Sequence, residues 1–272
     1  MTESAHSRVV LEVRGLQKAY GPITAIQDLD VSIRAGEITA IVGDNGAGKS
    51  TLVKILAGAE SPDDGQVYVN GEAVRLRGPH DARALGIETV FQDLALAPNR
   101  DVVSNLFLGR ELRLPGPLGT MGVLDKRAMR HRAGEQLESL GVRIPRLSGY
   151  PIGAMSGGQR QSVAVARAGF WATVAMLMDE PTAALGVRES QRVLVMARQV
   201  ADRGLAVVLI SHILPHVMEL ADRVIVMRQG RKVAELTDDI SSERLIGLIV
   251  GVDAKRVVED QGLAGPDERQ HE

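Results

Sequence analysis

The spacing of hydrophobic residues changes along the chain and predicts three successive regions. Up to residue 91, apolar positions come in short runs or alternate with polar ones, which is typical of β-strands. Val31 and Ile33 continue such a pattern, and Asn70-Gly71 predicts a tight hairpin turn. Residues 81–85 are a short predicted helix. The predicted strands cover residues 9–13, 23–29, 38–42, 66–69, 73–76 and 87–91.

From residue 92 to about 172 the apolar period becomes helical. Met129, Ala133, Leu137 and Leu140 recur at the spacing of one helix face. Residues 112–122, rich in proline and glycine, are expected to form a loop. The face opposite Met129 carries basic residues that we interpret as a solvated surface, because acids share the helix. The basic residues are Lys126, Arg127, Arg130 and Arg132, and the acids are Glu135 and Glu138.

After residue 173, predicted strands and helices alternate. Strands are expected at 174–178, 206–210, 224–227 and 232–236, and helices at 188–200, 216–220 and 243–250. Alternation of this kind predicts an α/β fold with a mainly parallel sheet and helices on both faces. The polar segment after residue 253 is expected to be disordered.

Residues 43–51 read GDNGAGKST and directly follow the apolar run 38–42. A Gly-x-x-x-x-Gly-Lys-Ser/Thr string between a strand and a helix is the pattern of a phosphate-binding loop (P-loop). Its glycines allow backbone N–H groups to turn around an anion, and the following helix points its positive end there. Lys49 is expected to reach the outer phosphates, and the Ser50 hydroxyl to bind Mg²⁺. The predicted nucleotide-binding residues are Gly43, Asp44, Asn45, Gly46, Ala47, Gly48, Lys49, Ser50 and Thr51.

Two adjacent carboxylates, Asp179 and Glu180, end the predicted strand 174–178. Ligands of α/β proteins bind at the carboxyl ends of the strands. Asp179 is therefore expected to hold Mg²⁺ together with Ser50. Glu180 is the candidate general base that deprotonates the attacking water.

The string MSGGQRQ, residues 155–161, opens a predicted helix. Ser156 is a favourable cap, and the two glycines leave backbone N–H groups exposed at the positive end of the helix. This segment predicts a second anion site, distinct from the P-loop.

In this order, the motifs resemble those of ATP-binding subunits of ABC transporters, over residues 9–250. Met155-Ser156-Gly157-Gly158-Gln159 is similar to that family's Leu-Ser-Gly-Gly-Gln signature, with methionine in place of leucine. The resemblance implies roles for three further residues. Gln92 would contact the metal and join the core to the helical subdomain, His212 would contact the γ-phosphate, and Tyr20 would stack on adenine.

The family's fold implies a P-loop NTPase (RecA-like) core with a mainly parallel sheet, an N-terminal antiparallel β subdomain and an inserted α-helical signature subdomain. Residues 9–92 and 173–250 would form the β-rich core, and residues 93–172 the helical subdomain. Residues 1–8 and 253–272 would be disordered tails.

The resemblance also implies an assembly. Each nucleotide would lie between the P-loop of one subunit and the signature of another. The chain contains one such unit, so a homodimer is expected. Partners would be integral membrane permease subunits and, indirectly, a solute-binding protein, at the cytoplasmic face of the cell membrane.

Gly186 departs from the family pattern, in which an aspartate follows the Pro-Thr-Ala-Ala-Leu segment. This departure puts detailed communication between the two sites in doubt. The Ala-Ala-Leu-Gly variant resembles carbohydrate importers of the ribose, xylose and fructose group. Residues 156–168 and 211–223 look most like the fructose-import branch.

Composition narrows the alternatives. The 272-residue chain has a net charge of −2, 3% aromatic residues and no cysteine. A nucleic-acid binder usually carries a basic surplus and stacking aromatics, so no nucleic-acid partner is expected. The apolar run 163–178 is too short for a membrane span and contains Arg167. The alternative functions are a soluble ABC-type ATPase acting on nucleic acid or ribosomes, and a nucleotide-gated interaction module with little turnover.

Overall fold

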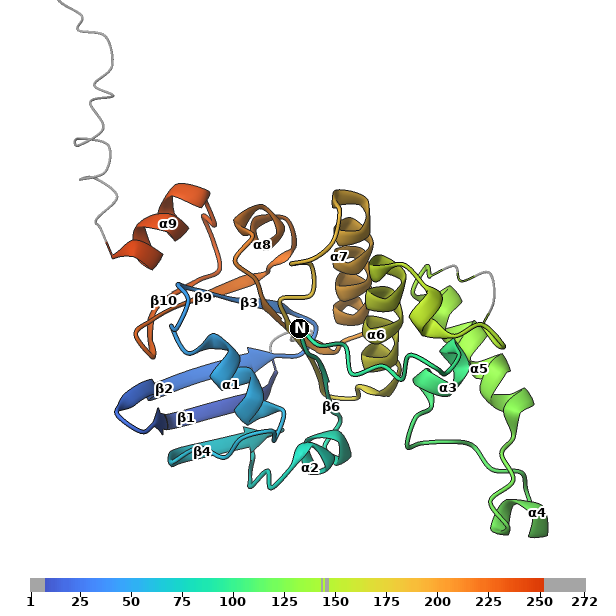
Figure 1. Cartoon of the computed structure of the whole chain (residues 1–272). Helices are drawn as coiled ribbons and strands as arrows, with labels where there is room; N and C mark the ends of the chain where they lie inside the picture. The colour runs from blue at the N-terminus through green and yellow to red at the C-terminus, as the bar shows by residue number, and fades with distance from the viewer. Residues whose placement is uncertain (1–7, 143, 145–146, 252–272) are drawn as a thin grey trace, which may run out of the picture.

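The structure is a computed structural model that describes residues 8–142, 144 and 147–251. Two sheets and a group of helices make up the described part of the molecule (Figure 1). The predicted disordered tails, residues 1–8 and 253–272, lie outside the described residues, apart from Arg8. No helix in the described ranges is long and apolar enough to cross a membrane.

The first sheet is antiparallel, with the strand order β2-β1-β4-β5. Its strands are β1 (Val9–Tyr20), β2 (Ile23–Arg34), β4 (Asp64–Val69) and β5 (Glu72–Val74). β1 runs beyond the predicted residue 13 because its register shifts at Gly15, whose φ is 58°, as in a β-bulge. Asn70 and Gly71 connect β4 and β5 with φ angles of 52° and 85°, which suits the predicted tight turn.

The second sheet has the strand order β10-β9-β3-β8-β7-β6. Its strands are β3 (Ile38–Val42), β6 (Ile87–Val90), β7 (Ala175–Asp179), β8 (Ala206–Ile210), β9 (Arg223–Arg228) and β10 (Arg231–Leu236). All neighbouring strands are parallel except β9 and β10. Every residue of β3, β7 and β8 is buried, which explains their continuous apolar runs. The predicted mainly parallel α/β fold is confirmed.

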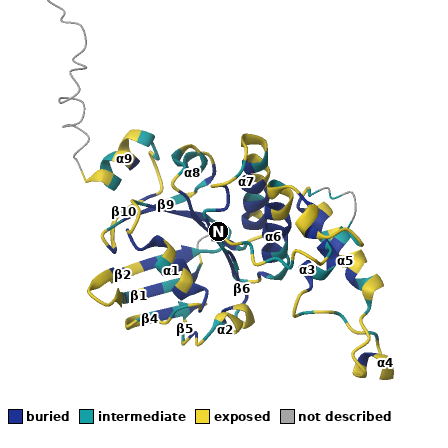
Figure 2. Ribbon diagram, in the orientation of Figure 1, coloured by how far each residue is buried: buried dark blue, intermediate teal, exposed yellow. Residues whose placement is uncertain are grey.

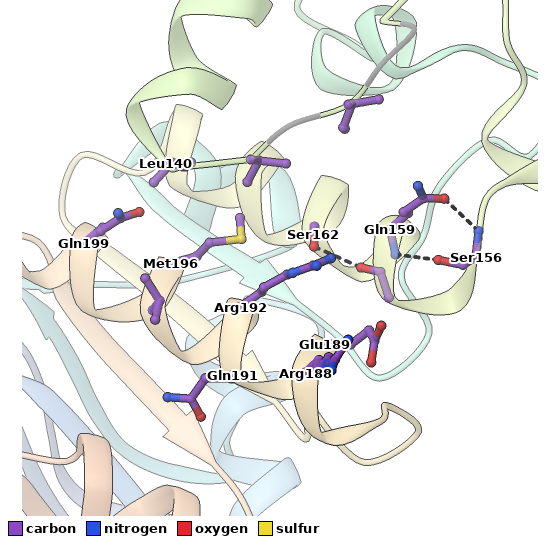
Figure 3. Close-up of a pocket in the computed structure, with 15 residues that line it drawn as sticks. Leu140, Ser156, Gln159, Ser162, Arg188, Glu189, Gln191, Arg192, Met196 and Gln199 are labelled. Carbon is purple, nitrogen blue, oxygen red and sulfur yellow. Dashed lines mark hydrogen bonds between the residues drawn. The ribbon is translucent and has the colours of Figure 1, made fainter.

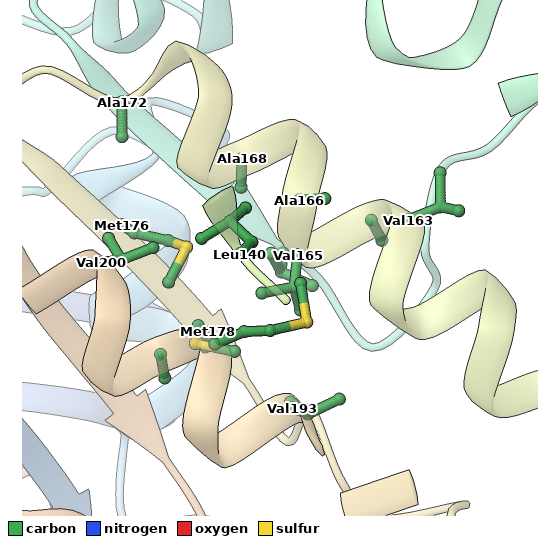
Figure 4. Packing of buried hydrophobic residues seen from close by; sticks show 14 of the residues in the cluster. Leu140, Val163, Val165, Ala166, Ala168, Ala172, Met176, Met178, Val193 and Val200 are labelled. Carbon is green, nitrogen blue, oxygen red and sulfur yellow. The ribbon is translucent and has the colours of Figure 1, made fainter. Parts of the chain in front are cut away.

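Helices cover both faces of this second sheet. α1 (Lys49–Leu56) lies between the two sheets, where Leu11 of β1, Leu52 of α1 and Leu177 of β7 share one hydrophobic cluster that also includes α2 (Pro79–Ala84). On the other face, Met176 and Met178 pack against α6 (Gly157–Trp171) and α7 (Val187–Asp202) (Figure 4). α8 (Leu214–Leu220) and α9 (Ser242–Val250) form a third cluster with β3 and β9.

The chain between β6 and β7 is mainly helical. It contains α3 (Val102–Leu106), α4 (Pro117–Thr120), α5 (Lys126–Ser139), a 3-10 turn (Ile152–Ala154) and α6. Met129, Ala133 and Leu137 are buried on one side of α5, as the helical period predicts. The division between the core and this helical part, at residues 93 and 172, stays a prediction.

The prediction that residues 112–122 form only a loop is wrong. α4 adds one helical turn, and Arg113 pairs with Leu124 in an isolated antiparallel bridge. Pro117 stands at the start of α4, where a missing N–H costs nothing. Proline therefore begins a helix here, although the composition of the segment is typical of a loop.

Candidate functional site

A cleft of about 480 Å³ opens at the carboxyl edge of the second sheet. The loop after β3, the turn between β1 and β2, and the segments after β6, β7 and β8 all contribute to its walls. Ile23, Ala25 and Ala183 line it as well, although nothing in the sequence marked them. The predicted site residues that line it are Tyr20, Asn45, Gly46, Ala47, Gly48, Lys49, Ser50, Thr51, Gln92, Glu180 and His212.

The P-loop adopts a backbone path that only glycine permits at two positions. Gly43 has a φ of 151°, and a Cβ there would lie 2.1 Å from the carbonyl oxygen of Met227. Gly48 has a φ of 97°, and a Cβ there would lie 2.3 Å from the carbonyl oxygen of Ala25. The loop is thus packed closely against β9 and β2, which holds its shape before any ligand enters.

Lys49 is buried at the start of α1, with its ammonium group inside the loop. Its Nζ donates hydrogen bonds to the carbonyl oxygens of Gly43, at 2.7 Å, and Asp44, at 2.8 Å. Burial lowers the pKa of Lys49, and the nearby carboxylates of Glu180, Asp44 and Asp179 act in the opposite direction. The ammonium group is therefore placed where an incoming anion would find a partly desolvated cation.

Asp179 ends β7 beside the P-loop helix. The Ser50 hydroxyl donates to its Oδ1 at 3.3 Å. Burial raises the pKa of Asp179, the bond from Ser50 lowers it, and the neighbouring Glu180 raises it further. Hydroxyl and carboxylate oxygens are the donors that Mg²⁺ prefers, and Gln92 lines the same cleft. Within the described ranges no three His, Cys, Asp or Glu side chains converge on a metal position.

Glu180 follows β7 in a strained backbone conformation, with a φ of 52° that is unusual for a residue with a side chain. Its N–H donates to the carbonyl oxygen of Ile210 at 3.1 Å, which ties it to the end of β8. Its Oε2 lies 2.5 Å from Nδ1 of His212. The pair stands at the edge of the cleft, with the carboxylate mostly shielded and the imidazole exposed.

Tyr20 and Ile23 flank the turn between β1 and β2 and give the cleft an apolar rim. Tyr20 is 42% exposed and Ile23 is 68% exposed. The Tyr20 hydroxyl donates to the carboxylate of Glu60, which fixes the ring beside the P-loop. This rim offers a flat apolar surface for a planar base.

The signature residues lie elsewhere. Ser156 and Gln159 form a capping box at the start of α6: Gln159 N–H donates to Ser156 Oγ at 3.2 Å, and Ser156 N–H to Gln159 Oε1 at 3.0 Å (Figure 3). Ser156, Gly158 and Gln159 line a second cavity, of about 600 Å³, between α6 and α7. No lining residue of the second cavity, as far as the described residues go, also lines the first. One chain therefore does not bring the signature to its own P-loop cleft.

Glu189 explains two small residues near this second cavity. A Cβ on Gly158 would lie 2.3 Å from Cγ of Glu189, and a Cβ on Gly186 would lie 2.9 Å from its Oε2 (Figure 3 shows Glu189 beside the signature turn). A side chain at 186, such as the family's aspartate, would have to displace Glu189. The glycine at position 186 thus fits the space that Glu189 leaves.

Arg167 has a structural role that the sequence alone does not assign to it. Its guanidinium donates to the carbonyl oxygens of Ala95, at 2.9 Å, and Leu94, at 3.1 Å. The signature helix α6 is thereby tied to the segment that follows Gln92. The only sign of this role in the sequence is that Arg167 places a single charge inside the apolar run 163–178.

A family model described as ABC transporter matches residues 26–183, more than half of the chain. The chain belongs to the ABC transporter family. The resemblance predicted from the P-loop and signature motifs is therefore confirmed. Membership of the ABC transporter family implies nucleotide binding.

Relatives in the ABC transporter family carry names of sugar import. The fructose import ATP-binding protein of Rhizobium meliloti is 48% identical over 224 residues, covering 82% of this chain and 86% of that protein. The xylose/arabinose import ATP-binding protein of Sulfolobus acidocaldarius is 43% identical over 222 residues, with 82% and 86% covered. A ribose import ATP-binding protein of Rubrobacter xylanophilus is 40% identical over 256 residues, covering 93% of this chain and 48% of that protein. The chain spans about half the length of this ribose relative.

Solved structures agree with the fold. A nucleotide-free ATP-binding cassette from an ABC transporter matches with a TM-score of 0.76 at 26% identity, covering 92% of this chain and 97% of that one. The ADP conformation of another ABC transporter cassette also gives 0.76 at 26% identity, covering 89% and 99%. The predicted P-loop NTPase fold is confirmed.

Proposed function

We propose that the chain is the ATP-binding and ATP-hydrolysing subunit of a sugar importer, with residues 9–250 acting as one ATPase unit. The observation that carries the proposal is the cleft that joins Lys49, Ser50, Glu180 and His212 at one sheet edge, with Asp179 bonded to Ser50. The names of the fructose, xylose/arabinose and ribose relatives favour sugar import over an ATPase acting on nucleic acid or ribosomes.

Each part of the cleft suits one part of ATP. Tyr20 and Ile23 would hold the adenine at the apolar rim, and the amides of residues 43–51 would bind the phosphates. Lys49 would exchange its bonds to the loop carbonyls for bonds to the outer phosphates. Ser50, Asp179 and Gln92 would hold Mg²⁺. When bound, this ion would neutralise part of the phosphate charge.

Hydrolysis needs a base for the attacking water. The Glu180 carboxylate would take the water proton while the water oxygen bonds to the γ-phosphorus. The bond from phosphorus to the β,γ-bridging oxygen breaks, and that oxygen leaves with ADP. His212, 2.5 Å from Glu180, would orient the carboxylate and donate to the γ-phosphate. The bond from Glu180 N–H to the Ile210 carbonyl holds the strained backbone at the strand end, which would keep the carboxylate beside the attacking water.

We further propose that the site is completed by a second copy of the chain. Ser156, Gly157, Gly158 and Gln159 cap a helix that points its positive end outward, and they lie apart from the cleft of their own chain. In a homodimer, this helix end would face the γ-phosphate bound by the partner. ATP would hold the two copies together, and loss of the γ-phosphate would let them separate.

The proposed partners are membrane permease subunits and, through them, a solute-binding protein, at the cytoplasmic face of the membrane. Arg167 offers a route for coupling, because it ties the signature helix to the segment after Gln92. A permease that moves this segment would move α6 with it.

Reconstitution tests the proposal. The chain is combined with its permease in vesicles that enclose sugar-loaded binding protein, and ATP turnover is measured. We expect turnover that rises when loaded binding protein is present and that requires Glu180. An ATP turnover rate that does not change with permease or sugar-loaded binding protein would refute coupling to import. An unchanged rate in Glu180→Gln would refute the assignment of the base.

A further inference from the structure

Residues 112–125 form a projecting hairpin, here named the α4 hairpin, at the end of the helical part farthest from the two sheets (Figure 1). Its surface is largely exposed, as Figure 2 shows. Four large apolar side chains are exposed within seven residues: Leu118 (54%), Met121 (79%), Val123 (42%) and Leu124 (36%). Residues 114–124 carry no charged side chain at all. A concentrated apolar surface of this kind marks an interaction site.

The α4 hairpin bonds more than half of its own backbone N–H groups internally. Leu114 N–H donates to the Val123 carbonyl at 2.9 Å, and Asp125 N–H to the Leu112 carbonyl at 2.7 Å. Each amide of residues 119–123 donates to a carbonyl oxygen inside the hairpin, and two prolines have no N–H to satisfy. Internal bonding of these groups lowers the cost of moving the tip out of water.

The hairpin also has a defined shape. Gly119 is buried, and a Cβ there would lie 1.7 Å from the carbonyl oxygen of Leu114. This approach closes the turn of α4 onto the segment that precedes it. The exposed apolar side chains are thus presented by a bonded turn and not by an extended loop.

Basic side chains surround the base of the tip. Arg113 precedes it and Lys126 and Arg127 follow it, all exposed, with Arg130, which donates to Ser148 Oγ at 3.0 Å, one turn further along α5. Two acids, Glu111 and Asp125, lie nearby in the chain. Asp125 uses its carboxylate to cap α5, where it accepts from Ala128 N–H at 2.9 Å. The cations of α5 taken alone are a solvated helix face, because acids share the helix. Beside an uncharged apolar tip they form the pattern that anionic membrane surfaces attract.

We propose that the α4 hairpin inserts its apolar tip into the interface of an anionic lipid bilayer, with the surrounding basic side chains against the lipid phosphates. The alternative occupant is a loop of the permease. Lipid is favoured because the tip carries no charge, bonds part of its own backbone and is bordered by cations that match anionic phosphates. The inference goes beyond the proposed function, since lipid contact requires neither nucleotide nor permease.

Vesicle sedimentation of the full chain, without nucleotide or permease, tests this contact. We expect binding to vesicles of phosphatidylcholine with 30% phosphatidylglycerol and little binding to phosphatidylcholine alone. Leu118→Asp with Met121→Asp should lower binding to the anionic vesicles at least tenfold. Lys126→Gln with Arg127→Gln should lower it by about fivefold for each charge removed, and added salt should lower it as well.

The matched control is Val195→Asp with Val233→Asp, which adds the same charge at apolar residues that are 47% and 38% exposed elsewhere. This control should bind anionic vesicles as the wild type does. ATP turnover, measured separately, should be unchanged in the hairpin variants, so failure of lipid binding leaves the ATPase proposal untouched. Equal losses in hairpin and control variants, or binding only when permease is present, would overturn the lipid assignment.

The absence of cysteine from the sequence allows a second measurement. M121C and, as control, V195C each carry one environment-sensitive fluorophore. On adding anionic vesicles, the label at 121 should shift to the blue and be quenched by lipid-borne nitroxides, while the label at 195 should not change. An unchanged spectrum at 121 would overturn insertion.

Discussion

Ser156→Ala removes one hydroxyl that has a structural bond within the chain and a proposed bond across the dimer. Within the chain, Ser156 Oγ accepts from Gln159 N–H at 3.2 Å. Loss of a serine cap costs about 1 kcal/mol. For a domain of this size that corresponds to a melting temperature lower by about 2–4 °C. The fold should therefore survive the substitution.

The same hydroxyl has a hydrogen left to donate, because accepting from Gln159 uses only a lone pair. We expect that hydrogen to bond the γ-phosphate held by the partner chain. A hydrogen bond to a charged group contributes about 1.5–3 kcal/mol. A homodimer would contain two such bonds, worth about 3–6 kcal/mol together, so Ser156→Ala should weaken ATP-driven dimerisation roughly 10²- to 10⁴-fold.

The assay titrates the chain with Mg·ATP and follows dimer formation by light scattering, with ATP affinity of the monomer measured by calorimetry. Asp125→Ala is the control, since Asp125 caps α5 through Ala128 N–H at 2.9 Å and has no place in the proposed dimer. It should lose similar stability and keep normal dimerisation. Equal dimer losses in both variants, or loss of monomer affinity in Ser156→Ala, would refute the reasoning.

Three further substitutions act on the P-loop cleft. Lys49→Ala should weaken ATP binding at least tenfold in calorimetry through the lost charged bonds, while the surface variant Lys232→Ala should bind normally. Gly48→Ala should destroy ATP binding because its Cβ would lie 2.3 Å from the carbonyl oxygen of Ala25. The control Gly204→Ala has a similar φ of 88° but open space around it, so it should lower stability without changing ATP affinity. Burial raises the pKa of Asp179, so its contribution to stability is complete at acid pH and is lost as pH rises through that pKa. Asp179→Asn should therefore raise the melting temperature of the nucleotide-free protein at pH 7, yet abolish the Mg²⁺-dependent stabilisation by ATP; a lower melting temperature would contradict this.

The sequence predicted the buried strands and the P-loop because their chemistry is local. β3, β7 and β8 are buried on both faces, so burial alone produces apolar runs. The φ angles of Gly43 and Gly48 are a local requirement that the motif records, although their close approaches to Met227 and Ala25 add a second one. The proposed site roles of Asp179 and Glu180 were predictable because both residues stand at a strand end, where ligands of α/β proteins bind.

Other features depend on contacts between distant segments, and the sequence did not predict them. α4 begins at a proline that composition alone assigns to a loop. Arg167 bonds carbonyl groups more than seventy positions away along the chain, and nothing next to it indicates that partner. Glu189 of α7 leaves no room for a side chain at Gly158 or Gly186. Gly158 belongs to α6, so its own neighbours in the sequence do not indicate this contact.

Light scattering of the Glu180→Gln variant with Mg·ATP tests the central claim most directly. Removing the carboxylate base should slow hydrolysis about 10²- to 10⁴-fold while ATP remains bound. The claim predicts a molecular mass twice that of one chain with Mg·ATP, and the mass of one chain with Mg·ADP. A single-chain mass with Mg·ATP, even after the permease is added, would contradict it.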